Sequence, residues 1–197
     1  MKKIKNGDII RIPLSKEMGF GYAKYIDLLS VDPETRYPSL IRVYNFRNMG
    51  EDIDVKQFNN TDLLLSPILI AGAEPAIRKK VWKVIGNLPV TTEEEEIPDY
   101  KYIDESKHYF FVKKADISKK IKSSFENTKH LEPIGAVGAQ LIGTKIAMAL
   151  LKDEGKDVES FFQLKNYYEQ VFFEQLSDCP PYYKQPEFMR GKAVTTA

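Results

Sequence analysis

The hydrophobic pattern changes its period along this chain of 197 residues. In the first 114 residues, apolar side chains alternate with polar ones in short runs separated by turn residues, which is typical of half-buried strands. Between residues 137 and 176 they recur at every third or fourth position, which is typical of helices that bury part of their surface. Strands followed by helices predict an α+β fold.

The strands of the first part are predicted at residues 10–14, 19–26, 40–46 and 80–85, with one or two more between 100 and 114. Pro13 cannot donate a ladder hydrogen bond, so the first strand is expected to lie at a sheet edge or to end there. Gly19 and Gly21 indicate a bulge or a close backbone approach. Strands of this spacing predict a small β-barrel, by analogy an SH3-like barrel, or a strongly bent antiparallel sheet.

The second part predicts two helices, over residues 137–151 and 158–176. Gly155 suits the position after the first helix, and Asp157 suits the N-cap of the second. A short connection of this kind predicts an antiparallel helical hairpin. The residues expected to be buried in it are Leu141, Phe161 and Phe172.

These patterns predict three divisions of the chain. A β-rich module would occupy residues 1–114, the helical hairpin residues 115–181, and an irregular tail residues 182–197. The hairpin is expected to end at the sequence Cys-Pro-Pro, residues 179–181, because proline cannot continue a helix.

Charge and composition exclude several classes of protein. The 29 basic and 28 acidic residues leave a net charge of +1, so the chain lacks the strongly basic character of many nucleic-acid-binding domains. A hydrophobic fraction of 43% with 12% aromatic residues excludes a mostly disordered chain. The basic start lacks the apolar segment of a signal peptide, and the longest apolar runs are too short to cross a bilayer. We therefore expect a cytoplasmic protein with no membrane partner.

Residues suited to catalysis or metal binding are sparse. Cys179 is the single cysteine, and with only His108 and His130 beside it the chain cannot build a disulfide or a zinc site. The stretch Gly138–Lys145 is similar to a phosphate-binding loop, but its threonine precedes the lysine instead of following it. We attribute its small residues to close helix packing. The sequence thus predicts no enzyme activity, no metal and no cofactor.

Two features could bind a partner. Tyr22 and Tyr25 lie on the second predicted strand, and Arg42 and Tyr44 on the third, where aromatic and basic side chains together could stack bases or hold a peptide. The alternative is that most of them fill the core. The second feature is the run Glu93, Glu94, Glu95 and Glu96, which could meet a basic partner surface or could be a solvated loop.

Two blocks of sequence resemble the immunity protein 26 family. Residues Gly7–Leu14 read Gly-Asp-Ile-Ile-Arg-Ile-Pro-Leu, and Gly19–Lys24 follow with a Gly-Tyr pair, as in the start of that family. Residues Trp82–Pro89 are similar to its Trp-x-x-Ile-Gly-x-Leu-Pro signature. Together the blocks cover about residues 4–105, and the helical part lies outside the resemblance.

The resemblance implies an immunity protein of a bacterial polymorphic toxin system, which binds the cognate toxin of its own cell. It implies no catalytic residues, and it presents Trp82, Gly86 and Pro89 as folding determinants. We therefore expect Trp82 to be buried. Many of the family's toxins are nucleases, whose basic cleft an acidic loop would complement, so we expect Glu93–Glu96 on the rim of the contact surface. The expected mechanism is steric occlusion.

The alternative function is a nucleic-acid-associated barrel of the transcription-factor type, which would use Lys24 together with the aromatic and basic residues of the two strands. The near-neutral charge makes nucleic acid an unlikely partner. Retention on nucleic acid that depends on salt would distinguish this alternative from an immunity protein. The sequence does not determine the oligomeric state.

Overall fold

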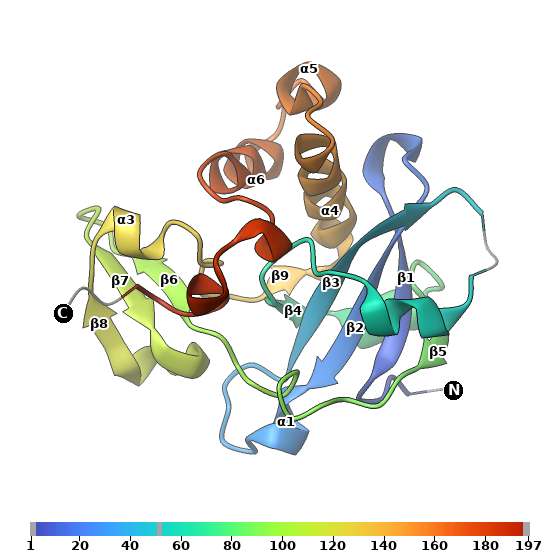
Figure 1. Cartoon of the computed structure of the whole chain (residues 1–197), viewed down its shortest axis with the longest axis horizontal. Coiled ribbons are helices and arrows are strands. Elements are labelled where there is room, and N and C mark those ends of the chain that lie inside the picture. Colours follow the sequence, from blue (N-terminus) through green and yellow to red (C-terminus); the bar gives the residue numbers. More distant parts are fainter. Residues whose placement is uncertain (1–2, 51–52, 195–197) are drawn as a thin grey trace.

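Within residues 3–50 and 53–194, which the computed structural model describes, a six-stranded sheet has the order β5-β1-β2-β3-β4-β9 (Figure 1). Its strands are β1 (Asp8–Pro13), β2 (Phe20–Asp27), β3 (Ser39–Asn48), β4 (Ile68–Ala71), β5 (Lys83–Asn87) and β9 (Val137–Gly138). Strand β9 pairs with β4 in parallel, and the other pairings are antiparallel. The chain therefore has the predicted α+β fold, with a mixed sheet.

The sheet is open, so of the two predicted forms, a small SH3-like barrel or a bent sheet, the barrel is wrong. Helix α4 (Ala139–Asp153) lies across β1 and β2, and its residues Ile142 and Ile146 belong to the same buried cluster as Ile10 and Ile12 of β1. A helix that covers the face of a sheet buries its apolar side chains, and the sheet then has no need to close on itself.

Local features of the first strands follow the sequence. Strand β1 ends at Pro13, and it lies between β5 and β2, not at an edge. The register between β2 and β3 shifts between Gly21 and Ala23, which is the irregularity that the two glycines predict. A Cβ atom on Gly21 would come within 3.0 Å of the Ile146 side chain, so this glycine also allows α4 to approach.

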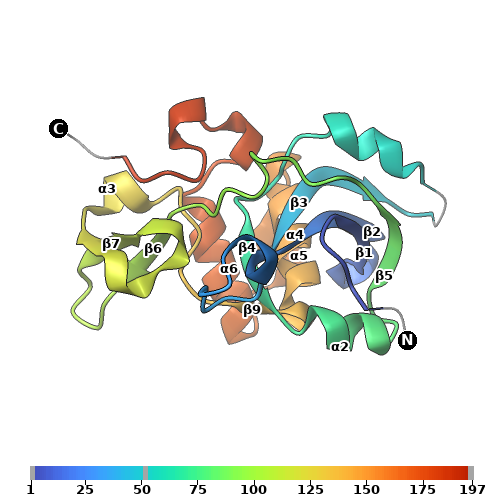
Figure 2. The same ribbon diagram turned by 90° about the horizontal axis from the view of Figure 1, so that it is seen from below.

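A second, smaller sheet has the order β6-β7-β8 and lies beside the first (Figure 2). Its strands are β6 (Tyr100–Ile103), β7 (Tyr109–Val112) and β8 (Lys120–Lys122). The sequence predicts the first two but not β8, which is three exposed residues long and too short for a visible alternation. The short helix α3 (Phe125–Thr128) follows it.

The predicted helical hairpin is present in part. Helix α4 ends at Asp153 with Glu154 as its C-cap, so Gly155 directly follows the cap, and Asp157 caps α5 (Val158–Phe162) by accepting from the Ser160 amide. The second predicted helix is broken, because Gln163 takes the left-handed conformation and α6 (Tyr167–Ser177) starts afresh with Asn166 as its N-cap. Helix α6 packs on α4.

The break corrects one prediction of burial. Phe161 is 42% exposed, since α5 is only a short segment that turns Phe162 and not Phe161 toward the core. Phe172 of α6 is buried as predicted, and Leu141 is partly buried against the same cluster.

The main core lies between the large sheet and the helices. It joins residues from β1 to β4 with residues of α4, α5 and α6, and Trp82 is buried in it with 2% of its surface exposed, as predicted. Gly143 confirms the interpretation of the small residues in α4, because a Cβ atom there would collide with the carbonyl oxygen of Pro13. The division at residue 114 stays a prediction, and residues on both sides of it share this core.

The remaining helical segments are short. They are α1 (Leu28–Val31) and α2 (Ala73–Arg78), with 3-10 turns at Ser15–Glu17, Val55–Asn60, Lys113–Ala115, Ile117–Lys119, Tyr182–Lys184 and Glu187–Met189. The last two turns lie in the tail, which runs from beside the large sheet to the small one (Figure 1). Its Tyr182 amide donates to Leu64 near the large sheet, and its Gly191 carbonyl accepts from Asp99 beside the small one.

Candidate partner-binding surface

The glutamate run lies in the segment that connects the two sheets. We call residues 91–96, between β5 and β6, the acidic loop. Within it the Glu94 carboxylate accepts from the Thr91 amide at 2.9 Å, and the Thr91 hydroxyl accepts from the Glu94 amide at 3.3 Å. The Glu95 amide donates to the Thr91 carbonyl at 3.2 Å. These reciprocal bonds give the loop a defined turn, although four adjacent glutamates repel one another.

A buried lysine holds the loop from the sheet side. Lys24 of β2 places its ammonium 2.6 Å from the Glu94 carboxylate and donates to the Pro89 carbonyl at 2.7 Å. Its side chain is 4% exposed, against 23% for that of Glu94. A charge removed from water to this extent needs a partner of opposite sign, so Lys24 and Glu94 fix each other.

A buried arginine holds the loop through its backbone. Arg42 of β3 donates to the carbonyl oxygens of Glu93 and Glu94 at 3.1 Å each, and reaches that of Glu96 at 3.5 Å. The planar guanidinium offers several donors in fixed directions, which suits three carbonyls of one turn. The structure therefore brings together the predicted residue Arg42 and the predicted glutamate run.

The loop leaves other carboxylates facing water. Glu93 and Glu96 are exposed and Glu95 is half-buried. Among the described residues, no ion pair involves these three side chains. The loop is thus anchored at Glu94 and at its backbone, while three carboxylates are available to a partner.

The predicted aromatic residues lie mostly in the core. Tyr22 is fully buried with its ring near those of Phe46 and Phe58, and Tyr25 is 8% exposed within the main core. Tyr44 stacks on Phe58 with ring centroids 4.6 Å apart. Burial raises the pKa of all three tyrosines above the usual value of a phenol. This placement agrees with the interpretation of these side chains as core residues.

A groove of about 370 Å³ runs along one side of the acidic loop. Lys24, Arg42 and Tyr44 line it from the sheet, and Tyr182, Tyr183 and Arg190 line it from the tail. Sequence reasoning did not identify the three tail residues as part of a surface. The tail has no periodicity, and its position depends on backbone bonds such as that from Tyr183 to Leu63, which leave no trace in the sequence.

The nucleic-acid alternative depends on the same strand residues. Lys24 and Arg42 are both less than one tenth exposed, and both direct their donors to the acidic loop. A basic surface for phosphates needs exposed cations, and at this place the carboxylates are exposed instead. The geometry therefore gives these strand residues no exposed basic surface for nucleic acid.

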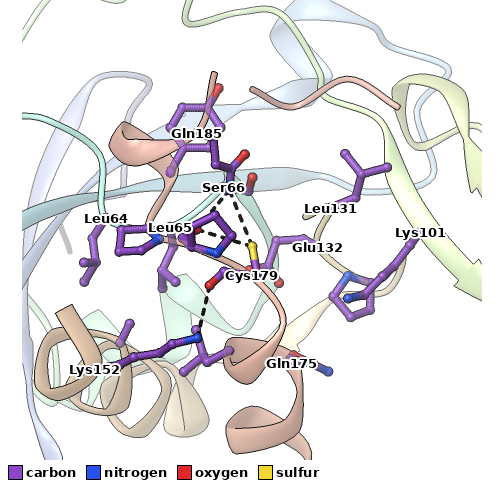
Figure 3. A pocket seen from close by; sticks show the side chains of 16 residues that line it. Leu64, Leu65, Ser66, Lys101, Leu131, Glu132, Lys152, Gln175, Cys179 and Gln185 are labelled. Atoms are coloured by element: carbon purple, nitrogen blue, oxygen red, sulfur yellow. Dashed lines mark hydrogen bonds between the residues drawn. The ribbon is translucent and has the colours of Figure 1, made fainter. Parts of the chain in front are cut away.

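A separate small cavity of about 20 Å³ lies between the large sheet, α4 and the tail (Figure 3). Cys179 lies beside it, and its carbonyl oxygen accepts a hydrogen bond from Lys152 at 3.4 Å. Burial raises the pKa of the Cys179 thiol to about 11, so the thiol is protonated at neutral pH and is a poor nucleophile. The cavity has room for about one water molecule and for no substrate.

Within residues 3–50 and 53–194, the two histidines and the acidic residues form no cluster suited to a metal. His130 is buried and bonds to the Lys192 carbonyl at 2.7 Å, and His108 bonds to Asp104 at 3.1 Å. In the part of the chain that the structure describes, no group of three His, Cys, Asp or Glu residues could hold a metal ion.

None of the helices in residues 3–50 and 53–194 has both the length and the apolar character of a membrane-crossing helix. No curated protein and no solved structure matched the chain. The family model of immunity protein 26 matches residues 5–111, a range that includes β1 to β6, the acidic loop and both cations that anchor it. Since the match covers more than half of the sequence, the chain belongs to the immunity protein 26 family.

Proposed function

We propose that this chain binds a cognate toxin and neutralises it by steric occlusion, with the acidic loop on the contact surface. Membership of an immunity protein family supports a toxin as the partner. The observation that carries the proposed site is the anchoring of the loop by two buried cations, Lys24 and Arg42, while Glu93, Glu95 and Glu96 have no ion pair among the described residues.

Anchoring matters because binding orders the groups that make contact. A loop that is already fixed loses less conformational entropy on association than a free one. Its carboxylates also attract a basic surface from a distance, which raises the association rate. A stable interface takes roughly 800 Å² from each partner, and the loop with its flanking groove and tail would form part of such an area.

The proposed mechanism uses no chemistry of the chain's own. The Cys179 thiol is half-buried and protonated. The stretch 138–145, which is similar to a phosphate-binding loop, is mostly the first part of helix α4, and its Gly143 packs against β1. Blocking access to a toxin's active site needs only shape and charge. A nuclease toxin would offer a basic cleft as the complementary surface. We place this function in the cytoplasm, where a toxin would reach the producing cell's own nucleic acids.

The test begins with growth rescue. The toxin domain encoded beside the gene for this chain is expressed in a sensitive host, alone and together with the chain. We expect growth to be restored and the two proteins to elute as one complex in size-exclusion chromatography. Continued growth arrest with well-folded chain present, and no complex, would contradict the proposed function.

The site is tested with charge-neutralising variants. Glu93→Gln, Glu95→Gln and Glu96→Gln are combined, and Glu94 is kept because it pairs with Lys24. We expect association to slow by about tenfold at low salt and to depend less on salt. The matched control combines Glu105→Gln, Glu159→Gln and Glu174→Gln, which removes the same charge from exposed residues elsewhere. Equal rates in both triple variants would remove the acidic loop from the interface.

A further inference from the structure

The other side of the acidic loop borders a second hollow. One groove of about 790 Å³ and another of about 640 Å³ meet there, and they share Glu96, Ile97, Lys114 and Lys119. We call them together the inter-sheet groove, because they lie where the chain passes from the large sheet to the small one. Figure 2 shows this connection crossing between the sheets beside the tail.

Two walls of opposite charge border this groove. Glu93, Glu95 and Glu96 of the acidic loop stand on one side. The turn after β7 stands on the other, with exposed Lys113 and Lys114. Among the described residues, no ion pair joins the two walls, and Lys119 pairs instead with Asp116 of its own turn at 2.8 Å.

Contacts with the large sheet and with a small core hold the backbone of each wall. Arg42 and Lys24 hold the acidic loop, and Ile97, just beyond it, packs on a small core of Ile26, Leu28 and Tyr100. Ala115 belongs to that same core and holds the lysine turn. The backbones of both walls are thus held, and their charged side chains, which form no ion pair with one another among the described residues, remain open to a partner.

Some other charges around the groove are already engaged, whereas the exposed Glu34, Arg36, Glu187 and Lys192 also line it and have no ion pair among the described residues. Arg190 donates to the carbonyl oxygens of Tyr183 and Gln185, and Asp99 accepts from the Ala193 amide. Asp32 accepts from the amide of Glu34. The four exposed residues add two charges of each sign, so the groove as a whole presents both acidic and basic side chains to a partner.

We infer that the inter-sheet groove receives a segment of the toxin that carries both charges, with a cationic side chain toward Glu93, Glu95 and Glu96 and a carboxylate toward Lys113 and Lys114. This inference rests on the proposed function and specifies the partner's chemistry. A uniformly basic surface would be attracted by one wall and repelled by the other. A polypeptide loop of mixed charge satisfies both, and like-charge contacts discriminate against wrong partners.

The lysine wall decides between these two kinds of partner. The probe is the toxin domain that passes the growth-rescue test, and association rates are measured at low salt by stopped-flow fluorescence. The variant combines Lys113→Glu with Lys114→Glu. The control combines Lys79→Glu with Lys165→Glu, which makes the same change of charge at exposed positions away from the groove. Unfolding curves of both variants establish that the fold is kept.

For a partner segment of mixed charge, we expect the Lys113/Lys114 variant to associate about tenfold more slowly than the control variant. Faster association than the control would show a uniformly basic partner surface, which overturns this inference and leaves the proposed function intact. Equal rates would place the lysine wall outside the interface and would also overturn it. Failure of growth rescue would instead overturn the proposed function, and this inference with it.

Discussion

The ion pair between Lys24 and Glu94 should stabilise the fold more than any other carboxylate of the acidic loop does. Glu94→Gln keeps the shape of the side chain and leaves the Lys24 ammonium, 4% exposed, without an opposite charge. Removing one partner of a fully buried pair costs about 3–5 kcal/mol. Glu94 is 23% exposed and the Pro89 carbonyl still accepts from Lys24, so we expect a loss of about 2 kcal/mol in the free energy of unfolding.

A double-mutant cycle separates this pair from other effects. Lys24→Met removes the buried charge itself and lets Glu94 turn to water, so we expect a smaller loss of about 1 kcal/mol. The double variant should then be more stable than the sum of the single losses predicts, with a coupling of about 1 kcal/mol. Urea unfolding is followed by the fluorescence of Trp82, the single tryptophan of the chain, which is buried in the folded state.

The matched control for this cycle is Glu93→Gln, which removes an exposed carboxylate with no ion pair among the described residues. It should change the free energy of unfolding by less than about 0.5 kcal/mol. If Glu94→Gln is as mild as this control, the acidic loop is not anchored by Lys24, and the argument for a fixed binding loop loses its main support.

Three further predictions concern the core and the tail. Trp82→Ala should lower the free energy of unfolding by about 3–5 kcal/mol in calorimetry, because it removes a large side chain that is 2% exposed; an unchanged melting temperature would contradict its place in the core. Gly143→Ala should lower the free energy of unfolding by about 1–3 kcal/mol, because the new methyl group meets the Pro13 carbonyl; urea unfolding followed by circular dichroism measures this. The control Gly155→Ala tests only backbone conformation, since nothing lies near its Cβ position. Burial lowers the pKa of His130 below the usual value near 6.5, so the unfolded chain takes up a proton more readily than the folded one. The free energy of unfolding should therefore fall as the pH drops below about 6.5. His130→Gln should flatten this dependence in unfolding curves measured from about pH 5 to pH 8.

The fold could be predicted from the sequence wherever a pattern is local. Alternation placed β1, β2, β3 and β5 within a few residues but did not mark β4, and Asp157 and Gly155 marked the helix boundary that forms. Trp82 and Gly143 were predictable because a large aromatic residue in a predicted strand and small residues on an apolar helix each have one common packing role.

Features that depend on distant parts of the chain could not be predicted in this way. The helix break at Gln163 has no glycine or proline to announce it, and the open sheet follows from the docking of α4, which no strand pattern reveals. The same distinction between local and distant features applies to the candidate surface. The glutamate run is visible in the sequence, but its partners Lys24 and Arg42 are about 70 and 50 residues away, and alternation alone cannot say that a basic strand residue is buried against a loop.

The most direct test of the central claim is differential hydrogen–deuterium exchange of the chain, free and bound to the toxin domain that passes the growth-rescue test. Backbone amides of an interface exchange more slowly in the complex. We expect new protection in residues 91–99 and in the turn at residues 113–119, while the exposed turn between α5 and α6 exchanges as in the free chain. Protection that appears at the α5–α6 turn and leaves the acidic loop unchanged would contradict the claim that this loop contacts the toxin.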